Sequence, residues 1–294
     1  MTTGVSLIEV PFMAGDAGHP AAAGPERLAR AAGTTLAGAR IPVGVARVTA
    51  RPPPAPAAPP ATAMATASAA VGREVAAAVR GSAAVGRFPL VLAGSCDAAI
   101  GVTAALSGSR CGVVWIDAHA DFNTPASSVS GFFPGMSLAV VTGHCHRRVW
   151  ARAGGGAHVA EDDVVLIGVR SLSPPEEARR LRRSAIDVVD WTAGGPGRDV
   201  ETCLDRLAGR VERIYLHVDN DAFDPDVAPG IVDAPVPGGL TLADMLRVVA
   251  AATRRFEVAA ATLATYTPAK DRDDRTLRAD LRIVELLGEH LARR

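Results

Sequence analysis

Two acidic clusters, each directly after an apolar run, constrain the fold of this chain most strongly. The first, DAHAD at 117–121, follows the apolar run 111–116, and the second, DND at 219–221, follows the run 214–218. Both runs have the length and composition of buried strands. Because successive side chains of a strand point to opposite faces, alternate members of each cluster are expected on one side. The clusters therefore predict two strands that end at a shared acidic site.

Such a site brings four carboxylates and one imidazole together. The expected members are Asp117, His119, Asp121, Asp219 and Asp221. Acids gathered near a sheet repel one another and lose hydration, unless they are protonated or a cation lies among them. A metal ion is the simplest solution. Oxygen ligands with an imidazole suit a hard or borderline divalent ion, so Mn²⁺ is our first choice, with iron, cobalt and zinc as alternatives.

Length and charge indicate one folded enzyme domain. The chain has 294 residues with 48% hydrophobic content, enough for one large α/β domain or two smaller ones, and we expect a single domain over 1–294. Lys plus Arg and Asp plus Glu are both 31, and no basic run is interleaved with aromatic residues. This balance argues against nucleic acid as a partner.

Nothing in the sequence predicts export or membrane insertion. Residues 1–11 carry no positively charged leader, and no apolar stretch reaches the ~20 residues that cross a bilayer. We therefore expect a cytoplasmic protein. Its four cysteines are widely spaced and form no CxxC pair, so they are predicted to be free thiols. They are Cys96, Cys111, Cys145 and Cys203.

Strand-like and helix-like segments alternate along the chain, which predicts a mostly parallel sheet with helices on both faces. The expected strands are 5–10, 43–48, 89–93, 111–116, 164–169, 213–218 and 258–264. The expected helices are 25–32, 71–85, 243–255 and 275–291. One proline- and alanine-rich segment, 51–60, contains six prolines and is predicted to be an exposed loop rather than a domain boundary.

Ligands in such sheets lie beyond the carboxyl ends of the strands. Both acidic clusters fall there. So do residues 94–97, after the strand 89–93, and residues 265–268, after the strand 258–264. Four strand ends are therefore candidates to surround one pocket, and the pattern leaves open which of these strands are neighbours.

The order and spacing of these motifs resemble the arginase, or ureohydrolase, family over almost the full length. The matching segments are 11–12, 24–28, 94–101, 117–125, 130–136, 167–170, 217–230 and 235–241. The resemblance implies a three-layer α/β/α fold with a sheet of about eight strands, assembled as a homo-oligomer, a trimer or hexamer. It implies two Mn²⁺ ions that serve hydrolysis of guanidino C–N bonds. The five residues of the acidic site match metal ligands, and Asp121 and Asp219 match the bridging ones.

Three positions depart from the family pattern. Cys96 stands where the family has its first histidine ligand, and a thiolate is softer and binds only after losing its proton. We expect Cys96 to be a ligand of the weaker Mn²⁺ site, with plain space-filling as the alternative. Pro134 stands at the family's catalytic histidine, and Thr265 at a glutamate that holds the guanidinium in arginases.

Further matches concern the substrate. Asn123 and Ser130 fall on arginase positions that contact the α-carboxylate, and Glu176 on an acidic position near the α-amino group. Together with Thr265 they are the expected substrate-binding residues, although Asn123 has an alternative role in fixing the turn before Pro125. They favour a guanidino or N-hydroxyguanidino amino acid, cleaved to urea or hydroxyurea.

Asp121 is the expected catalytic residue, because its counterpart in the family hydrogen-bonds the attacking water and can relay a proton. His144 and His146 are expected on the surface, and His217 in a buried structural hydrogen bond. Two alternatives remain open. One is a catalytically degenerate binding or regulatory protein, permitted by the three departures. The other, less favoured, is an amidohydrolase acting on N-acyl amines.

Overall fold

The computed structural model describes residues 3–50, 60–231 and 235–293, and these form one sheet of nine strands in the order β2-β1-β3-β9-β8-β4-β5-β6-β7. The strands are β1 (Gly4–Val10), β2 (Val43–Arg47), β3 (Arg87–Ala93), β4 (Gly112–Ile116), β5 (Val164–Val169), β6 (Asp187–Thr192), β7 (Gly195–Pro196), β8 (Arg213–Asp219) and β9 (Glu257–Ala264). Every pairing is parallel except that of β6 with β7. The expected number was about eight; the ninth is the two-residue strand β7 at the edge.

The described part of the chain contains nine α-helices, eight of them between strands and the last after β9. They are α1 (Gly24–Gly38), α2 (Pro60–Ala84), α3 (Ala98–Leu106), α4 (Ser137–Val141), α5 (Arg147–Arg152), α6 (Pro175–Arg183), α7 (Val200–Ala208), α8 (Leu242–Arg255) and α9 (Arg275–Ala292). Single 3-10 turns include Pro134–Met136 before α4 and Asn220–Ala222 after β8.

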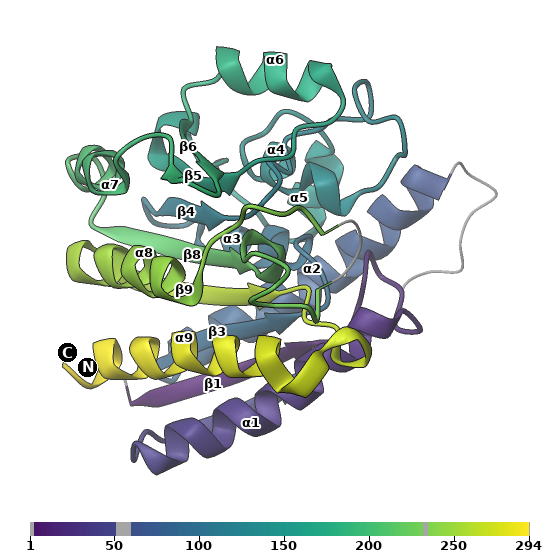
Figure 1. Cartoon of the computed structure of the whole chain (residues 1–294). Helices are drawn as coiled ribbons and strands as arrows, with labels where there is room; N and C mark the ends of the chain where they lie inside the picture. The colour runs from purple at the N-terminus through teal and green to yellow at the C-terminus, as the bar shows by residue number, and fades with distance from the viewer. Residues whose placement is uncertain (1–2, 51–59, 232–234, 294) are drawn as a thin grey trace.

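The helices form a layer on each face of the sheet (Figure 1). Helices α1, α7, α8 and α9 pack on one face, where Leu28, Leu204, Met245 and Ile283 join one hydrophobic core with the sheet. Helices α2, α3 and α4 cover the other face, where Val75, Val102 and Leu138 join a second core. The three-layer α/β/α fold expected from the sequence is confirmed.

The central strands are buried on both faces, which explains their almost unbroken apolar sequence. All five residues of β4 are buried, and only Arg213 of β8 is not. Strand β6, which the apolar pattern did not predict, alternates buried and exposed residues and carries aspartates at 187 and 190. Because β6 lies near the edge of the sheet, it needs apolar residues on only one of its faces.

The sequence predictions hold with shifted boundaries. Helix α2 begins at Pro60, earlier than the expected residue 71. Most of the expected loop 51–60, namely 51–59, lies outside the described residues, and Pro60 already belongs to α2. All four cysteines are free thiols. Within the described ranges, no helix combines the length and apolarity needed to cross a membrane.

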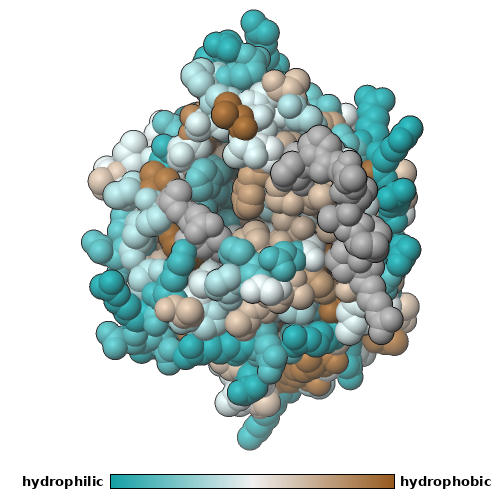
Figure 2. All heavy atoms as spheres, turned by 90° about the vertical axis from the view of Figure 1, so that its right-hand side faces the viewer, coloured by the Kyte–Doolittle hydropathy of each residue, from teal (hydrophilic) through white to brown (hydrophobic). Residues whose placement is uncertain are grey.

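The sheet order answers the question that the sequence left open. Strands β3, β9, β8 and β4, which precede the four polar segments, are consecutive neighbours. Ala264 pairs with both Ala93 and Asp219, and Ile116 pairs with Val218, so the four strands end at nearly the same level. The strand arrows point to the right in Figure 1, and Figure 2 looks onto this end, where the surface is hollowed near its centre.

Candidate metal centre

Asp117 lies directly after β4 and is fixed on both carboxylate oxygens. Its Oδ2 accepts a hydrogen bond of 3.0 Å from Trp115 Nε1, and its Oδ1 accepts one of 2.7 Å from the backbone of His119. Burial, reinforced by the nearby charge of Asp221, raises the pKa of Asp117 to about 6. A buried carboxylate held this way favours a nearby positive charge.

His119 and Asp221 lie beside Asp117. The His119 Nδ1 atom is 2.9 Å from Asp221 Oδ2 and 3.5 Å from Asp117 Oδ1. One ligand atom from each of the three residues lies within 4.8 Å of the others. Burial alone would lower the pKa of His119, but hydrogen bonds to the two carboxylates raise it to about 12. An imidazolium therefore supplies positive charge at a position that a divalent ion could take.

Asp219 and Cys96 form a second, deeper contact. The Cys96 thiol donates to Asp219 Oδ2 at 2.6 Å, and Asp219 Oδ1 accepts from the Asp221 backbone at 2.8 Å and from the Thr265 hydroxyl. Burial and the neighbouring aspartates raise the pKa of both Cys96 and Asp219 well above their usual values. A bound cation that took Cys96 as a ligand would have to displace the proton of this thiol, which makes metal binding pH-dependent.

Asp121 carries an oxygen without a partner. Its backbone has a φ of 48°, uncommon for a residue other than glycine, and its carbonyl accepts from the backbone of Leu138 and Ala139. The Asp121 Oδ2 atom is buried and has no hydrogen-bond partner among the described residues. Burial, then the charge of Asp117, raises its pKa. Because an unpaired buried oxygen is destabilising, the donor set fits a bound divalent cation.

The expected substrate-binding residues differ in burial and in their hydrogen-bond partners. Asn123 is buried, with its Nδ2 donating to the Ser173 carbonyl and its Oδ1 accepting from Ser127, both within the loops. These bonds match the alternative turn-fixing role. Ser130 is exposed, and its Oγ accepts from the Phe132 backbone at 3.2 Å. Thr265 lies at the centre, bonded to Asp219.

The role expected of Glu176, contact with a substrate amino group, stays a prediction. The residue lies on the exposed side of α6, paired with Arg179, and does not join the other site residues. Its neighbour Glu177 is turned inward instead, where it accepts from the backbones of Phe122 and Ser173 at 3.1 Å each. One residue along a helix rotates the side chain by about 100°, and the sequence alone did not reveal which glutamate faces inward.

Two further expectations concern histidines and Pro134. Pro134 begins a 3-10 turn, and its carbonyl accepts from Ser137 at 2.6 Å. His144 is exposed, as the sequence predicted, and its Nε2 is 2.7 Å from Glu161. His217 does make the expected buried hydrogen bond, with Nδ1 2.9 Å from the Tyr215 hydroxyl. The sequence did not indicate that one of its ring nitrogens would lie within 4.8 Å of ligand atoms of Cys96 and Asp117.

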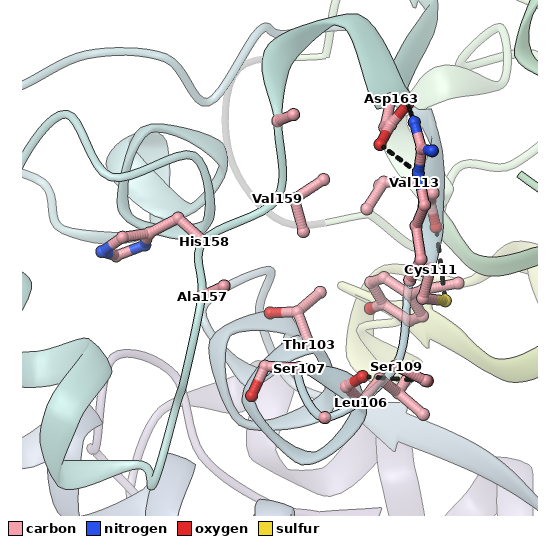
Figure 3. A pocket seen from close by; sticks show the side chains of 15 residues that line it. Thr103, Leu106, Ser107, Ser109, Cys111, Val113, Ala157, His158, Val159 and Asp163 are labelled. Carbon is pink, nitrogen blue, oxygen red and sulfur yellow. Dashed lines mark hydrogen bonds and ion pairs between the residues drawn. The ribbon is translucent and has the colours of Figure 1, made fainter. Parts of the chain in front are cut away.

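A separate cavity of about 350 Å³ lies at the amino end of β4 (Figure 3). It is bounded by the end of α3, the first residues of β4 and the segment 157–160, with Asp163 held by Arg110 at its edge. Its lining includes none of the acidic-site residues. The candidate chemistry therefore lies at the opposite end of the sheet.

Comparisons with known proteins agree with this arrangement. A model of the arginase family matches residues 3–288. The arginase of Bacillus caldovelox is 34% identical over 224 residues, 74% of each chain, and that of Bacillus subtilis strain 168 is 32% identical over 211 residues, 70% of each.

Solved structures give the same result. The native Bacillus caldovelox arginase at pH 5.6 superposes with a TM-score of 0.84 at 28% identity, covering 98% of both chains. An arginase structure from Bacillus subtilis gives 0.83 at 26% identity, covering 97% of this chain and 98% of that one. Agreement over nearly the whole chain, together with the family match from residue 3 to 288, means that this chain belongs to the arginase family.

Proposed function

We propose that this chain is a metal-dependent hydrolase that cleaves a C–N bond of a guanidino or N-hydroxyguanidino amino acid and releases urea or hydroxyurea. Membership of the arginase family supports the reaction class. One observation carries the proposal: the unpaired buried oxygen of Asp121 among ligand-bearing side chains at the ends of adjacent strands. This arrangement offers several anionic donors to a cation and leaves one carboxylate oxygen without a hydrogen-bond partner.

Two divalent ions are the proposed cofactors. Asp117, His119 and Asp221 would hold one ion, and their oxygen and nitrogen donors suit Mn²⁺. Asp121 and Asp219, buried next to this set, would hold a second ion together with Cys96. When bound, the ions supply Lewis acidity and lower the pKa of a coordinated water toward neutrality.

Asp121 is the proposed proton carrier. Its Oδ2 atom is free to accept a hydrogen bond from the attacking water and to pass the proton to the leaving nitrogen. Burial, then the charge of Asp117, raises the pKa of this carboxyl, which favours its holding a proton during the reaction. Pro134, whose side chain bears no acid, leaves this task to Asp121.

Thr265 supports a substrate of reduced basicity. Its hydroxyl is already bonded to Asp219, and no carboxylate occupies this position to pair with a guanidinium. A fully charged guanidinium therefore lacks an ion-pair partner here. An N-hydroxyguanidine has a lower pKa and carries less positive charge, so the missing carboxylate costs it less binding free energy. At the other end, both polar atoms of Asn123 are bonded within the loops, so Ser130 is the exposed hydroxyl left for a carboxylate.

A substrate panel tests this proposal. The full chain, reloaded with Mn²⁺ after chelation, is assayed for urea and hydroxyurea with arginine, N-hydroxyarginine, agmatine, guanidino acids and an N-acyl amine. We expect turnover of a guanidino amino acid, highest for the N-hydroxy form. Asp121→Asn should reduce kcat by at least about a hundredfold. Glu212→Gln, at an exposed residue just before β8, is the matched control and should behave as wild type.

The opposite results are equally clear. Turnover of only the N-acyl amine would indicate an amidohydrolase. Metal binding without turnover of any compound would favour the binding or regulatory role that the changes at Cys96, Pro134 and Thr265 permit. Equal activity with agmatine and arginine would remove the argument for an amino-acid substrate.

A further inference from the structure

The site contains an imidazole that the proposed chemistry has not used. His217 lies on β8, two residues before Asp219. Its side chain therefore points to the same face of the sheet as that of Asp219, but farther from the end of the strand. It pairs in register with Trp115 on β4 and with Thr262 on β9. None of its surface is exposed.

Neighbouring side chains fix the orientation of this ring. The indole of Trp115 stacks on it, with ring centroids 3.8 Å apart and an interplanar angle of 27°. On its edge, Nδ1 is 2.9 Å from the Tyr215 hydroxyl. The same Trp115 donates its Nε1–H to Asp117, so one residue positions both the imidazole and the carboxylate.

The hydrogen bonds also assign the tautomer. The Tyr215 hydroxyl donates its only proton to Thr262 Oγ1 at 2.7 Å. It can therefore only accept from His217, which places the proton of the imidazole on Nδ1. The other nitrogen, Nε2, then carries a lone pair. A ligand histidine in proteins is commonly arranged this way, with its second nitrogen donating to a neighbouring acceptor.

The lone pair of Nε2 faces the site. Nε2 is buried and has no hydrogen-bond partner among the described residues. One imidazole nitrogen of His217, Cys96 Sγ and a carboxylate oxygen of Asp117 all lie within 4.8 Å of one another. Nδ1 is engaged by Tyr215, so Nε2 is the nitrogen available to this group. A buried nitrogen without a partner is destabilising unless something binds it.

We propose that His217 Nε2, the Cys96 thiolate and the Asp117 carboxylate ligate one of the two metal ions. The inference rests on the proposed function, because it assigns ligands within that same centre. Asp117 also belongs to the set with His119 and Asp221, so it joins the two half-sites. Sulfur at position 96 and an imidazole from β8 thus replace the imidazole that the family pattern has at position 96.

The two half-sites then differ in their preferred metal. The deep half-site offers sulfur, nitrogen and oxygen, a donor set that suits Zn²⁺ or Co²⁺ better than Mn²⁺. The outer half-site offers one nitrogen and two carboxylates, a set that accepts Mn²⁺. Cys96 donates to Asp219 at 2.6 Å, and binding of the ion releases this thiol proton to solvent.

Metal spectroscopy on the full chain tests the assignment without a substrate. The chelated wild type receives one equivalent of Zn²⁺, and X-ray absorption measures the scatterers around it. We expect one sulfur at about 2.3 Å and nitrogen or oxygen at about 2.0 to 2.1 Å. Imidazole scattering should persist in His119→Ala, because His217 remains. A zinc shell of oxygen alone, or loss of imidazole scattering in His119→Ala, would overturn the proposal.

Variants provide a second readout with Co²⁺, whose thiolate complex absorbs in the near ultraviolet. Cys96→Ala should lose this band, and His217→Ala should bind about one ion fewer per chain. Tyr215→Phe, which removes the acceptor for Nδ1, should weaken the deep half-site by roughly 10- to 100-fold. His144→Ala, an imidazole paired with Glu161, is the control and should match wild type.

These measurements separate this inference from the proposed function. Sulfur and imidazole around zinc without any urea release would leave the ligand assignment standing and overturn the hydrolase. Urea release from a protein whose zinc has only oxygen neighbours would support the hydrolase and overturn the ligand assignment. Unchanged cobalt binding by a folded Tyr215→Phe, judged from its near-ultraviolet circular dichroism, would contradict a ligand role for His217.

Discussion

At the scale of single residues, Cys96 changes the chemistry of the centre most. A thiol buried beside three aspartates holds its proton strongly, since burial and their charges raise its pKa. Mn²⁺ prefers oxygen and nitrogen donors and gains little from displacing that proton. The deep half-site is therefore expected to be the weaker one for Mn²⁺.

Replacing this thiol should change metal preference in a defined direction. Cys96→His should raise the Mn²⁺ affinity of the weaker site by about tenfold and lower its relative preference for Zn²⁺. Isothermal titration with each metal measures both effects. Cys203→Ser, which alters a buried thiol on α7, should leave both affinities unchanged. Identical Mn²⁺ binding by Cys96→His and wild type would argue against a ligand at position 96.

Thr265 acts on the centre through Asp219. It has a φ of 70°, a rare conformation for a β-branched residue, and its hydroxyl donates to Asp219 Oδ1. Thr265→Ala should weaken metal binding by roughly 10- to 100-fold, because Asp219 loses an orienting donor. Thr265→Ser, which keeps the hydroxyl, should restore most of the affinity. Equal loss in both variants would show that the methyl group, not the hydrogen bond, matters.

Residue patterns predicted the acidic members of the site but not their surroundings. Asp117 and Asp219 follow apolar runs, so their place at strand ends could be read from the length and composition of those runs. The free nitrogen of His217 and the inward glutamate at 177 could not. Both depend on contacts between segments far apart in the chain, such as Cys96 with residues of β8. No local periodicity encodes such contacts.

At the scale of elements, Arg170 joins the end of β5 to the loop after β8. Its guanidinium donates to five carbonyl oxygens, which belong to Gly168, Asp221, Ala222, Phe223 and Val236. Asp221 is therefore held through its backbone as well as its side chain. This arrangement explains how a loop can present a ligand with the rigidity of a strand.

Removing this guanidinium should loosen the loop. Arg170→Met leaves several partly buried carbonyls unpaired, and we expect a loss of about 3 kcal/mol or more in the free energy of unfolding. Metal affinity should fall as well. Without the guanidinium, part of the free energy of metal binding is spent on ordering the loop that carries Asp221. Arg170→Lys keeps the charge but not the planar guanidinium group. Its free energy of unfolding and its metal affinity should lie between those of Arg170→Met and wild type. Chemical denaturation with and without metal measures both effects.

Helix α9 contributes a buried acid next to the same loop. Asp280 accepts from Asn220 Nδ2 at 3.1 Å, and burial raises its pKa to about 8. The folded state therefore binds a proton that the unfolded chain has lost above about pH 4. Stability from this group is present at low pH and falls as the pH rises from about 4 to about 8.

This linkage predicts a pH-dependent difference between two proteins. Asp280→Asn cannot ionise, so its Tm relative to wild type should rise by about 5 °C or more between about pH 5 and about pH 8.5. Thermal unfolding of both proteins is measured in the same chelator, so that neither binds metal. The carboxylates of the metal centre then titrate alike in both and do not contribute to the difference in Tm. A difference in Tm that stays constant over this range would contradict an ionisable Asp280 in the fold.

At the scale of the whole molecule, the order of the strands creates the site. Four polar segments that are scattered between residues 94 and 268 meet because β3, β9, β8 and β4 are neighbours. Alternation of strands and helices predicted the parallel sheet and its two helical layers. It could not predict that β9, close to the end of the chain, inserts between β3 and β8. Long crossovers decide this order, and they leave no signal in the local pattern.

The central claim is that these strand ends hold divalent cations. Calorimetric titration of the chelated full chain with Mn²⁺ tests it most directly. The account predicts two ions per chain, the second bound more weakly, and proton release on binding that differs between buffers. Asp219→Ala should bind neither ion tightly. A wild-type chain that remains folded yet takes up no Mn²⁺ would contradict the account.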